Sequence, residues 1–192
     1  MKRTLALIAV ALSLGGCVSR DMDLPLQSAE ELDRVRASNL ADYRLGPDDQ
    51  VALTIYGEPD LTKTYRVGPD GAVDVPLVGP VQAAGLTIDA FARSVQARLA
   101  AGYLQNPSVA GTIAEYRPFF ILGEVNKPGQ YPFRPGMTLD GAVALAGGYT
   151  YRAHPDFVII QGENEAVGHR VTISSALAIR PGDTIRVAER FF

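Results

Sequence analysis

Residues 119–125 read Phe-Phe-Ile-Leu-Gly-Glu-Val, a run that favours a β-strand because aromatic and β-branched side chains suit a pleated, half-buried surface. The run ends at Asn126-Lys127-Pro128-Gly129, where Pro followed by Gly suits a type II turn. Residues 130–133 then return as a second strand. Thr138 caps a short helix that Gly147-Gly148 ends. The order strand, turn, strand and helix predicts an α+β unit.

Three more strands are expected after this helix, at residues 157–160, 170–173 and 184–187, because each run is rich in β-branched side chains. The segment Arg180-Pro181-Gly182-Asp183 supplies the turn before the last of them. We therefore expect residues 116–192 to form one small mixed sheet with a packed helix.

An earlier block, residues 43–115, has the same mixture of strand and helix signals. Leu45-Gly46-Pro47-Asp48-Asp49 predicts a turn, as does Gly68-Pro69-Asp70-Gly71, because Pro presets φ and Gly permits positive φ. Strands are expected on either side of these turns and at the end of the block, at residues 51–56, 65–67, 72–75 and 108–116.

One longer helix is expected inside this block. Thr87 suits its N-cap, Asp89 suits the positive end of its dipole, and Gly102 suits the position just past its end. Its apolar stripe consists of Ile88, Phe91, Ala92, Val95 and Leu99. The sequence of residues 85–90 is similar to that of residues 136–141. This similarity predicts either two hairpin-plus-helix units in tandem or shared capping chemistry alone.

The N-terminus has the layout of an exported lipoprotein. Lys2-Arg3 precedes an apolar run, residues 4–14, that is too short to span a bilayer permanently, and Gly15-Gly16 follows it. The next residue, Cys17, is the single cysteine of the 192-residue chain, so an internal disulfide cannot explain its thiol. The alternatives, an ordinary signal peptide or a short buried helix, would leave the position of this cysteine unexplained. We expect a signal peptide over residues 1–16, resembling a bacterial lipobox, and a lipid such as palmitate on Cys17.

Residues 17–42 are expected to be a lipidated N-terminus and a tether, because they are polar and charged. Ser28 could cap a short helix ending near Asn39. Val18-Ser19 follows the cysteine without an Asp, which by resemblance to enterobacterial sorting favours the outer membrane. Removing residues 1–16 takes away two basic groups and no acid, so the formal net charge goes from -3 to -5. This acidic balance gives no support for nucleic-acid binding.

The residues that carry catalysis are sparse. His154 and His169 are the two histidines, and with the cysteine assigned to lipid they are too few ligands for a zinc site. Asp48-Asp49 lies in a predicted turn, and turn formation is a simpler interpretation of these two residues than a carboxylate metal site. The sequence lacks a Gly-x-Ser-x-Gly motif and a phosphate-binding glycine loop. We therefore expect no enzyme activity, no metal and no cofactor.

Aromatic residues gather in the second block, and aromatic faces stack on sugars. The alternative is that they are core residues and strand formers, which is stronger for the phenylalanines. The residues concerned are Tyr116, Phe119, Phe120, Tyr131, Phe133, Tyr149 and Tyr151.

Two series of motifs carry a family resemblance. The first consists of residues 43–51 (YRLGPDDQV), 57–61 (GEPDL), 67–71 (VGPDG) and 76–79 (PLVG), and resembles the polysaccharide export domain of outer-membrane polysaccharide export (OPX) lipoproteins. The second consists of residues 120–131 (FILGEVNKPGQY), 144–148 (ALAGG) and 180–183 (RPGD), and resembles the soluble-ligand-binding β-grasp (SLBB) domain. The resemblance covers Tyr43 to Phe192.

The resemblance implies a function. Members of this family form homo-oligomeric rings at the periplasmic face of the outer membrane and pass capsule or exopolysaccharide outward without making or breaking bonds. They work with an inner-membrane polysaccharide co-polymerase, often coupled to a tyrosine kinase. Larger members have several β-grasp domains and a C-terminal amphipathic helix that walls a pore. This sequence ends at Arg190-Phe191-Phe192 after one such domain, so we expect either that a separate outer-membrane pore protein completes the path or that the lipid-tethered ring sits beneath one. The first alternative function is that of a monomeric periplasmic glycan-binding or scaffold lipoprotein that regulates synthesis. A cell-envelope glycan hydrolase, with paired carboxylates among its many Asp and Glu residues, is the second alternative.

Overall fold

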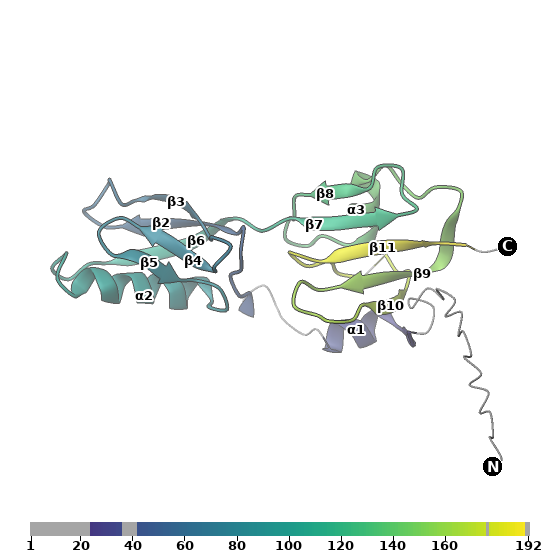
Figure 1. The fold of residues 1–192 in the computed structure, drawn as a ribbon, viewed down its shortest axis with the longest axis horizontal. Helices are drawn as coiled ribbons and strands as arrows, with labels where there is room; N and C mark the ends of the chain where they lie inside the picture. The colour runs from purple at the N-terminus through teal and green to yellow at the C-terminus, as the bar shows by residue number, and fades with distance from the viewer. Residues whose placement is uncertain (1–23, 36–41, 176, 191–192) are drawn as a thin grey trace, which may run out of the picture.

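The computed structural model describes residues 24–35, 42–175 and 177–190, which form two domains side by side along the long axis of the molecule (Figure 1). The signal peptide expected over residues 1–16 and the lipidation site Cys17 lie outside the described residues. Strands and helices are mixed in both domains, which confirms the expected α+β class. Within the described ranges, every helix is too short or too polar to cross a membrane.

The first domain has two antiparallel sheets and one helix. Its three-stranded sheet has the order β3-β2-β6, and its second sheet is the hairpin β4-β5. The bounds are β2 Gln50–Ile55, β3 Lys63–Arg66, β4 Ala72–Val75, β5 Gly79–Gln82, α2 Ile88–Ala100 and β6 Val109–Glu115. The alternation in β2 buries Val51, Leu53 and Ile55 against the stripe of α2. These side chains form one apolar core in this domain.

Helix α2 begins and ends where its sequence signals predict. Thr87 is its N-cap and accepts a hydrogen bond from Ala90 N at 3.3 Å. Gly102, just past the C-cap Ala101, has a φ of 139°. Four members of the expected stripe are buried, and Ile88 is partly buried against the same core.

The expected turn over residues 68–71 forms, but its flanking strands are not each other's partners. Gly68 N donates to Ala72 O at 2.8 Å, and Gly71 N to Gly68 O at 2.9 Å. Strand β3 pairs with β2, whereas β4 pairs with β5, a strand that the sequence analysis did not predict. The physical reason is that Gly79 and Pro80 have low strand propensity, so β5 depends on its partner β4.

The second domain has a six-stranded mixed sheet of order β1-β10-β9-β11-β7-β8, with parallel pairing in β1–β10 and β7–β11. Helices α1 and α3 both contribute to the core on one side of this sheet. The bounds are β1 Leu26–Gln27, α1 Ala29–Val35, β7 Phe119–Gly123, β8 Gly129–Tyr131, α3 Leu139–Leu145, β9 Ala153–Gln161, β10 His169–Thr172 and β11 Thr184–Glu189. Helices α2 and α3 each follow a hairpin, β4-β5 and β7-β8 respectively.

The N-terminal arm, residues 26–35, corrects the expectation of a tether over residues 17–42. Leu26 and Gln27 pair with β10 at the edge of the six-stranded sheet. Leu32 is 0% exposed in the core of the second domain, and Ser28 Oγ accepts a hydrogen bond from Glu31 N at 3.1 Å. The arm folds here because one leucine and one capping serine fit a site that the rest of the chain builds. The remaining residues of the expected tether and of the helix expected to reach Asn39 are outside the described ranges, apart from residues 24, 25 and 42.

The segment 126–129 does not form the expected type II turn. Gly129 lies in β8 and is absent from the residues with positive φ. Asn126 instead binds the end of α3, with its Nδ2 donating to Gly147 O at 2.7 Å and its backbone N to Gly148 O at 3.0 Å. Contact with the helix end therefore determines the local backbone. The φ values of Gly147 and Gly148, 78° and 88°, explain the glycine pair there.

Candidate functional site at the junction of the domains

Asp49 is a buried carboxylate where the two domains meet. Its side chain is 0% exposed and receives hydrogen bonds from three residues. The Tyr43 hydroxyl lies 2.8 Å from each carboxylate oxygen, Gly46 N donates to Oδ2 at 2.8 Å, and Arg117 N donates to Oδ1 at 2.7 Å. These donors compensate the loss of water, because a buried charge is tolerated when it is paired and hydrogen-bonded. Asp49 therefore fixes the first domain to the start of the second.

The Arg117 side chain continues this network into the second domain. Its Nη1 lies 3.5 Å from Asp49 Oδ2, and its Nε lies 3.0 Å from Glu163 Oε2 as an ion pair without a hydrogen bond. A Cβ on Gly46 would lie 1.7 Å from Arg117 Nη1, and a Cβ on Gly182 would lie 2.9 Å from Arg117 Nε. Both glycines are therefore required for the guanidinium to lie between the domains.

Two matching turns meet at this guanidinium. In Gly46-Pro47-Asp48-Asp49 and in Arg180-Pro181-Gly182-Asp183, the last N–H donates to the first carbonyl at 3.2 Å. The last carboxylate also accepts the first N–H, at 2.8 Å from Gly46 and 2.9 Å from Arg180. The third position has a φ of 73° at Asp48 and 80° at Gly182. Each turn leads directly into a core strand, β2 or β11.

An aromatic chain runs alongside the polar network. The rings of Tyr43 and Tyr116 meet edge to face at 5.0 Å, and those of Tyr116 and Phe133 at 5.5 Å. The Arg117 guanidinium lies 5.6 Å from the centroid of the Tyr43 ring. Burial, and next the negative charge of Asp49, hold the pKa of the Tyr43 hydroxyl well above its usual range. Tyr43 is therefore a neutral hydrogen-bond donor at physiological pH.

A cleft of about 860 Å³ opens beside the junction. Residues of the N-terminal arm, of the segment before β2, of the segment between β6 and β7 and of two loops of the second domain line it. They are Asp33, Asp42, Tyr43, Arg44, Arg117, Phe133, Gly136, Met137, Thr138, Ala178, Ile179, Arg180 and Pro181. Ligand pockets commonly occur where domains meet. We call this feature the junction cleft.

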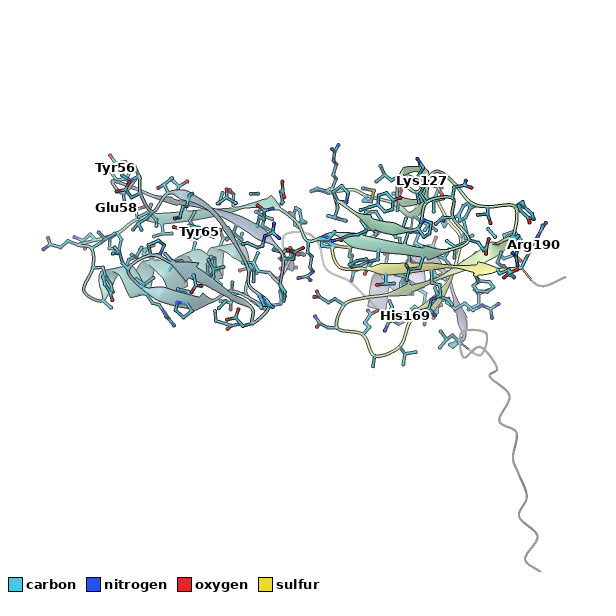
Figure 2. The ribbon with its side chains drawn as sticks, turned by 45° about the horizontal axis from the view of Figure 1, so that its top comes forward. Tyr56, Glu58, Tyr65, Lys127, His169 and Arg190 are labelled. Carbon is cyan, nitrogen blue, oxygen red and sulfur yellow. The ribbon has the colours of Figure 1, made fainter. Side chains whose placement is uncertain are left out.

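The aromatic residues considered for sugar stacking do not form one surface. Phe119 and Phe133 are buried, whereas Tyr151 is 81% exposed and Phe120 40% exposed. Tyr131 stacks on Phe119 and its hydroxyl donates to Lys127 O at 2.6 Å. An exposed tyrosine of the first domain, Tyr56, lies at the end remote from the second domain (Figure 2). Of the seven residues considered, Phe133 lines the junction cleft and Tyr116 supports it.

The two histidines serve the second domain separately. His154 lies against Phe157 with ring centroids 4.2 Å apart, and His169 Nδ1 lies 3.2 Å from Gln27 Oε1. The described parts of the chain contain no group of three or more His, Cys, Asp or Glu side chains that could hold a metal ion. Asp48, considered with Asp49 as a turn, is exposed and pairs with Arg66 at 2.8 Å.

Sequence reasoning treated Asp49 as an ordinary turn residue and did not single out Arg117. A signal was nevertheless present in the sequence. Pro47 and Pro181 each precede, by two residues, an aspartate that leads into an alternating apolar strand. The repeat of this spacing indicates that the aspartates have a common structural role.

Comparison with protein families divides the chain at this same junction. The family described as polysaccharide biosynthesis/export protein matches residues 37–114, and the SLBB domain matches residues 118–167. The chain belongs to the polysaccharide export family and carries an SLBB domain. We therefore call the first domain the export domain and the second the SLBB domain. Tyr116 and Arg117 lie between the two matches, so the network joins one family domain to the other.

Relatives of this export-family chain include longer proteins. The exopolysaccharide production protein ExoF of Rhizobium meliloti (strain 1021) is 31% identical over 72% of this chain and 36% of its own length. A polysialic acid transport protein KpsD of Escherichia coli is 28% identical over 56% of this chain and 20% of its own length. The chain thus spans about a third and a fifth, respectively, of these relatives.

Proposed function

We propose that this chain is a lipid-anchored subunit of a ring that exports capsule or exopolysaccharide at the periplasmic face of the outer membrane, acting as a conduit without catalysis. Its family and the names of its relatives, which refer to exopolysaccharide production and polysialic acid transport, support a role in polysaccharide export. The proposed partners are the polysaccharide, further copies of the chain, an inner-membrane polysaccharide co-polymerase with its tyrosine kinase, and a separate outer-membrane pore protein.

The N-terminal arm is the observation that carries the anchoring part of this proposal. Leu26 pairs with β10 of the SLBB sheet, and Leu32 is buried in the SLBB core. An extended chain spans at most about 3.3–3.6 Å per residue, so a lipid on Cys17 lies within roughly 30 Å of Leu26. A lipid at that position holds the SLBB domain close to the membrane, and the export domain follows through the junction.

The junction supports the ring. One small subunit cannot enclose a polymer channel, whereas head-to-tail contacts that close on themselves can. Closure requires the same domain arrangement in each copy, because small angular differences accumulate around a ring. Asp49 and Arg117 support a fixed arrangement, since the buried Asp49 carboxylate of the first domain binds the main chain and side chain of Arg117 at the start of the second. Rigidity at this position is what a closed ring requires of its subunit.

Deletion of the gene in a strain without a second copy tests the export function. We expect surface polysaccharide to fall and polymer to accumulate in the periplasm, and the wild-type gene on a plasmid should restore both. Normal surface polysaccharide in the deletion strain would contradict the proposal.

Native mass spectrometry of the acylated protein in detergent tests the ring separately. We expect one closed oligomer of defined subunit number. A strictly monomeric protein at high concentration would instead support a monomeric glycan-binding or scaffold lipoprotein.

A further inference from the structure

The junction cleft has the dimensions of a ligand site and is built from three parts of the chain. Its volume of about 860 Å³ is within the roughly 300–1,000 Å³ typical of small-ligand pockets. Asp33 comes from the N-terminal arm, Asp42 and Tyr43 come from the segment before β2, and Met137 comes from the SLBB domain. A ligand in the cleft would therefore contact both domains and the arm at once.

The lining combines apolar surface with hydrogen-bond donors and hydrogen-bond acceptors. Tyr43, Phe133 and Met137 supply aromatic and thioether surface. Asp33 and Asp42 have no hydrogen-bond or ion-pair partner among the described residues, so their carboxylates are available as acceptors. Arg44 supplies donors, and its Nη1 is held by Gly85 O at 2.8 Å. Sugar rings match this combination, because they have apolar C–H faces and hydroxyls that both donate and accept.

The charges at the cleft favour an uncharged ligand over an acidic one. Arg117 is already paired with two carboxylates, Asp49 at 3.5 Å and Glu163 at 3.0 Å. Counted together with these two carboxylates, the cleft has four acids, Asp33, Asp42, Asp49 and Glu163, against three bases, Arg44, Arg117 and Arg180, a formal charge of -1. An acidic ligand would gain no overall Coulomb attraction from this excess of negative charge and would lose hydration on entering.

We propose that the junction cleft binds a short run of uncharged sugar units, with ring faces against Tyr43 and Met137 and hydroxyls bonded to Asp33, Asp42 and Arg44. The source of these sugars, the exported polymer, rests on the proposed function, whereas the chemistry of the site does not. A bound oligosaccharide contacts the arm and both domains, so occupancy adds to the stability of the junction.

The test uses the full acylated protein in detergent and oligosaccharides of a few units, released by mild acid from the surface polysaccharide of the producing strain. Each sample is divided, and in one half any uronic acid is reduced to the neutral sugar. Saturation-transfer NMR and calorimetry measure binding. We expect the reduced, neutral oligosaccharides to bind at least as tightly as the unreduced ones. Absence of binding by the neutral samples, or binding by the acidic samples alone, would overturn the proposal.

Variants locate the site. The double variant D33A/D42A should weaken binding by about tenfold or more, because it removes two charged hydrogen-bond acceptors. The matched control D70A/D74A alters two acids of the β4 region outside the cleft and should bind as the parent protein does. Circular dichroism establishes that all variants are folded. Equal affinity of D33A/D42A and the parent would exclude the cleft as the site.

The two proposals fail separately. Sugar binding at the cleft with normal surface polysaccharide in the deletion strain would remove the export function and leave the site. Loss of surface polysaccharide in the deletion strain, with no sugar binding in vitro, would leave the export function and remove the site.

Discussion

The backbone N–H of Arg117 donates to Asp49 Oδ1 at 2.7 Å, across 68 positions of sequence. The same arginine directs its guanidinium to Asp49 and to Glu163, so one residue binds both domains by its main chain and its side chain. The segment between β6 and β7 is therefore part of a network, centred on the buried Asp49, that connects the export domain to the SLBB domain.

Asp49→Asn should lower the free energy of unfolding by about 3 kcal/mol, because an amide group replaces one oxygen and faces an N–H donor of Gly46 or Arg117. Urea unfolding measures the change. The neighbouring substitution Asp48→Asn removes an exposed ion pair with Arg66 and should cost at most about 1 kcal/mol. Equal losses in the two variants would mean that the buried network contributes little.

Gly182→Ala should loosen the junction. The added Cβ would lie 2.9 Å from Arg117 Nε, at a φ of 80° that disfavours alanine. The control is Gly57→Ala, which has a similar φ of 84° and no atom within 4 Å of the added Cβ, and should cost only about 1–2 kcal/mol.

The distance between the two domains can be measured by electron paramagnetic resonance. Nitroxides are attached at Tyr56→Cys and Tyr151→Cys, two exposed positions in different domains, in a Cys17→Ser background. The width of the distance distribution then reports how rigid the junction is. We expect a narrow distribution for the parent and for Gly57→Ala, and a broad one for Gly182→Ala. A narrow distribution in Gly182→Ala would contradict the role given to Arg117.

Stability should fall as the pH rises above about 10, the ordinary pKa of tyrosine. The pKa of Tyr43 is raised in the folded state, so above pH 10 the unfolded chain loses a proton that the folded chain keeps, and unfolding becomes more favourable. Tyr43→Phe should make this decline less steep. The difference in the free energy of unfolding between Tyr43→Phe and the parent protein at pH 8 separately gives the cost of the lost hydrogen bonds to Asp49. An unchanged slope in Tyr43→Phe would exclude Tyr43 as a source of the pH dependence.

Leu32→Ala should cost about 2–5 kcal/mol, because it leaves a cavity under the N-terminal arm in the SLBB core. Leu26→Ala, at a side chain that is 52% exposed, should change stability by no more than about 0.5 kcal/mol. Limited proteolysis should show faster cleavage of the arm in Leu32→Ala alone. Similar protection in both variants would indicate that the arm does not depend on this leucine.

Cys17→Ser should release a folded protein from the membrane fraction and impair export, since the proposed lipid is the covalent anchor. Fractionation with immunoblotting measures the first effect, and surface polysaccharide the second. Full membrane retention with normal export would show that protein partners, and not a lipid, hold the chain in place.

Local signals predicted the elements that depend on few neighbours. Thr87, the apolar stripe and Gly102 define α2 within the sequence itself, and the structure places the helix there. Strands β1 and β5 were missed, because Leu26-Gln27 is too short to show a period and Gly79-Pro80 has low strand propensity. Their formation depends on β10 and β4, which are already in place.

The junction was missed for a related reason. Asp49 follows Pro47 in a turn that any solvated loop could adopt, and its burial depends on Arg117 in another part of the chain. A contact between residues so far apart in the sequence cannot be predicted from the residues around either one alone. The repeated spacing of Pro and Asp at residues 47–49 and 181–183 was the available signal.

The N-terminal arm also determines how the molecule bears mechanical load. Because β1 joins the SLBB sheet before the chain enters the export domain, tension applied ahead of Leu26 passes into β10 through parallel hydrogen bonds. These bonds are loaded along the strand direction, and the export domain lies outside the path of the force. A subunit pulled by the proposed lipid anchor would thus begin to yield at the edge of the SLBB sheet, while its export domain stays folded.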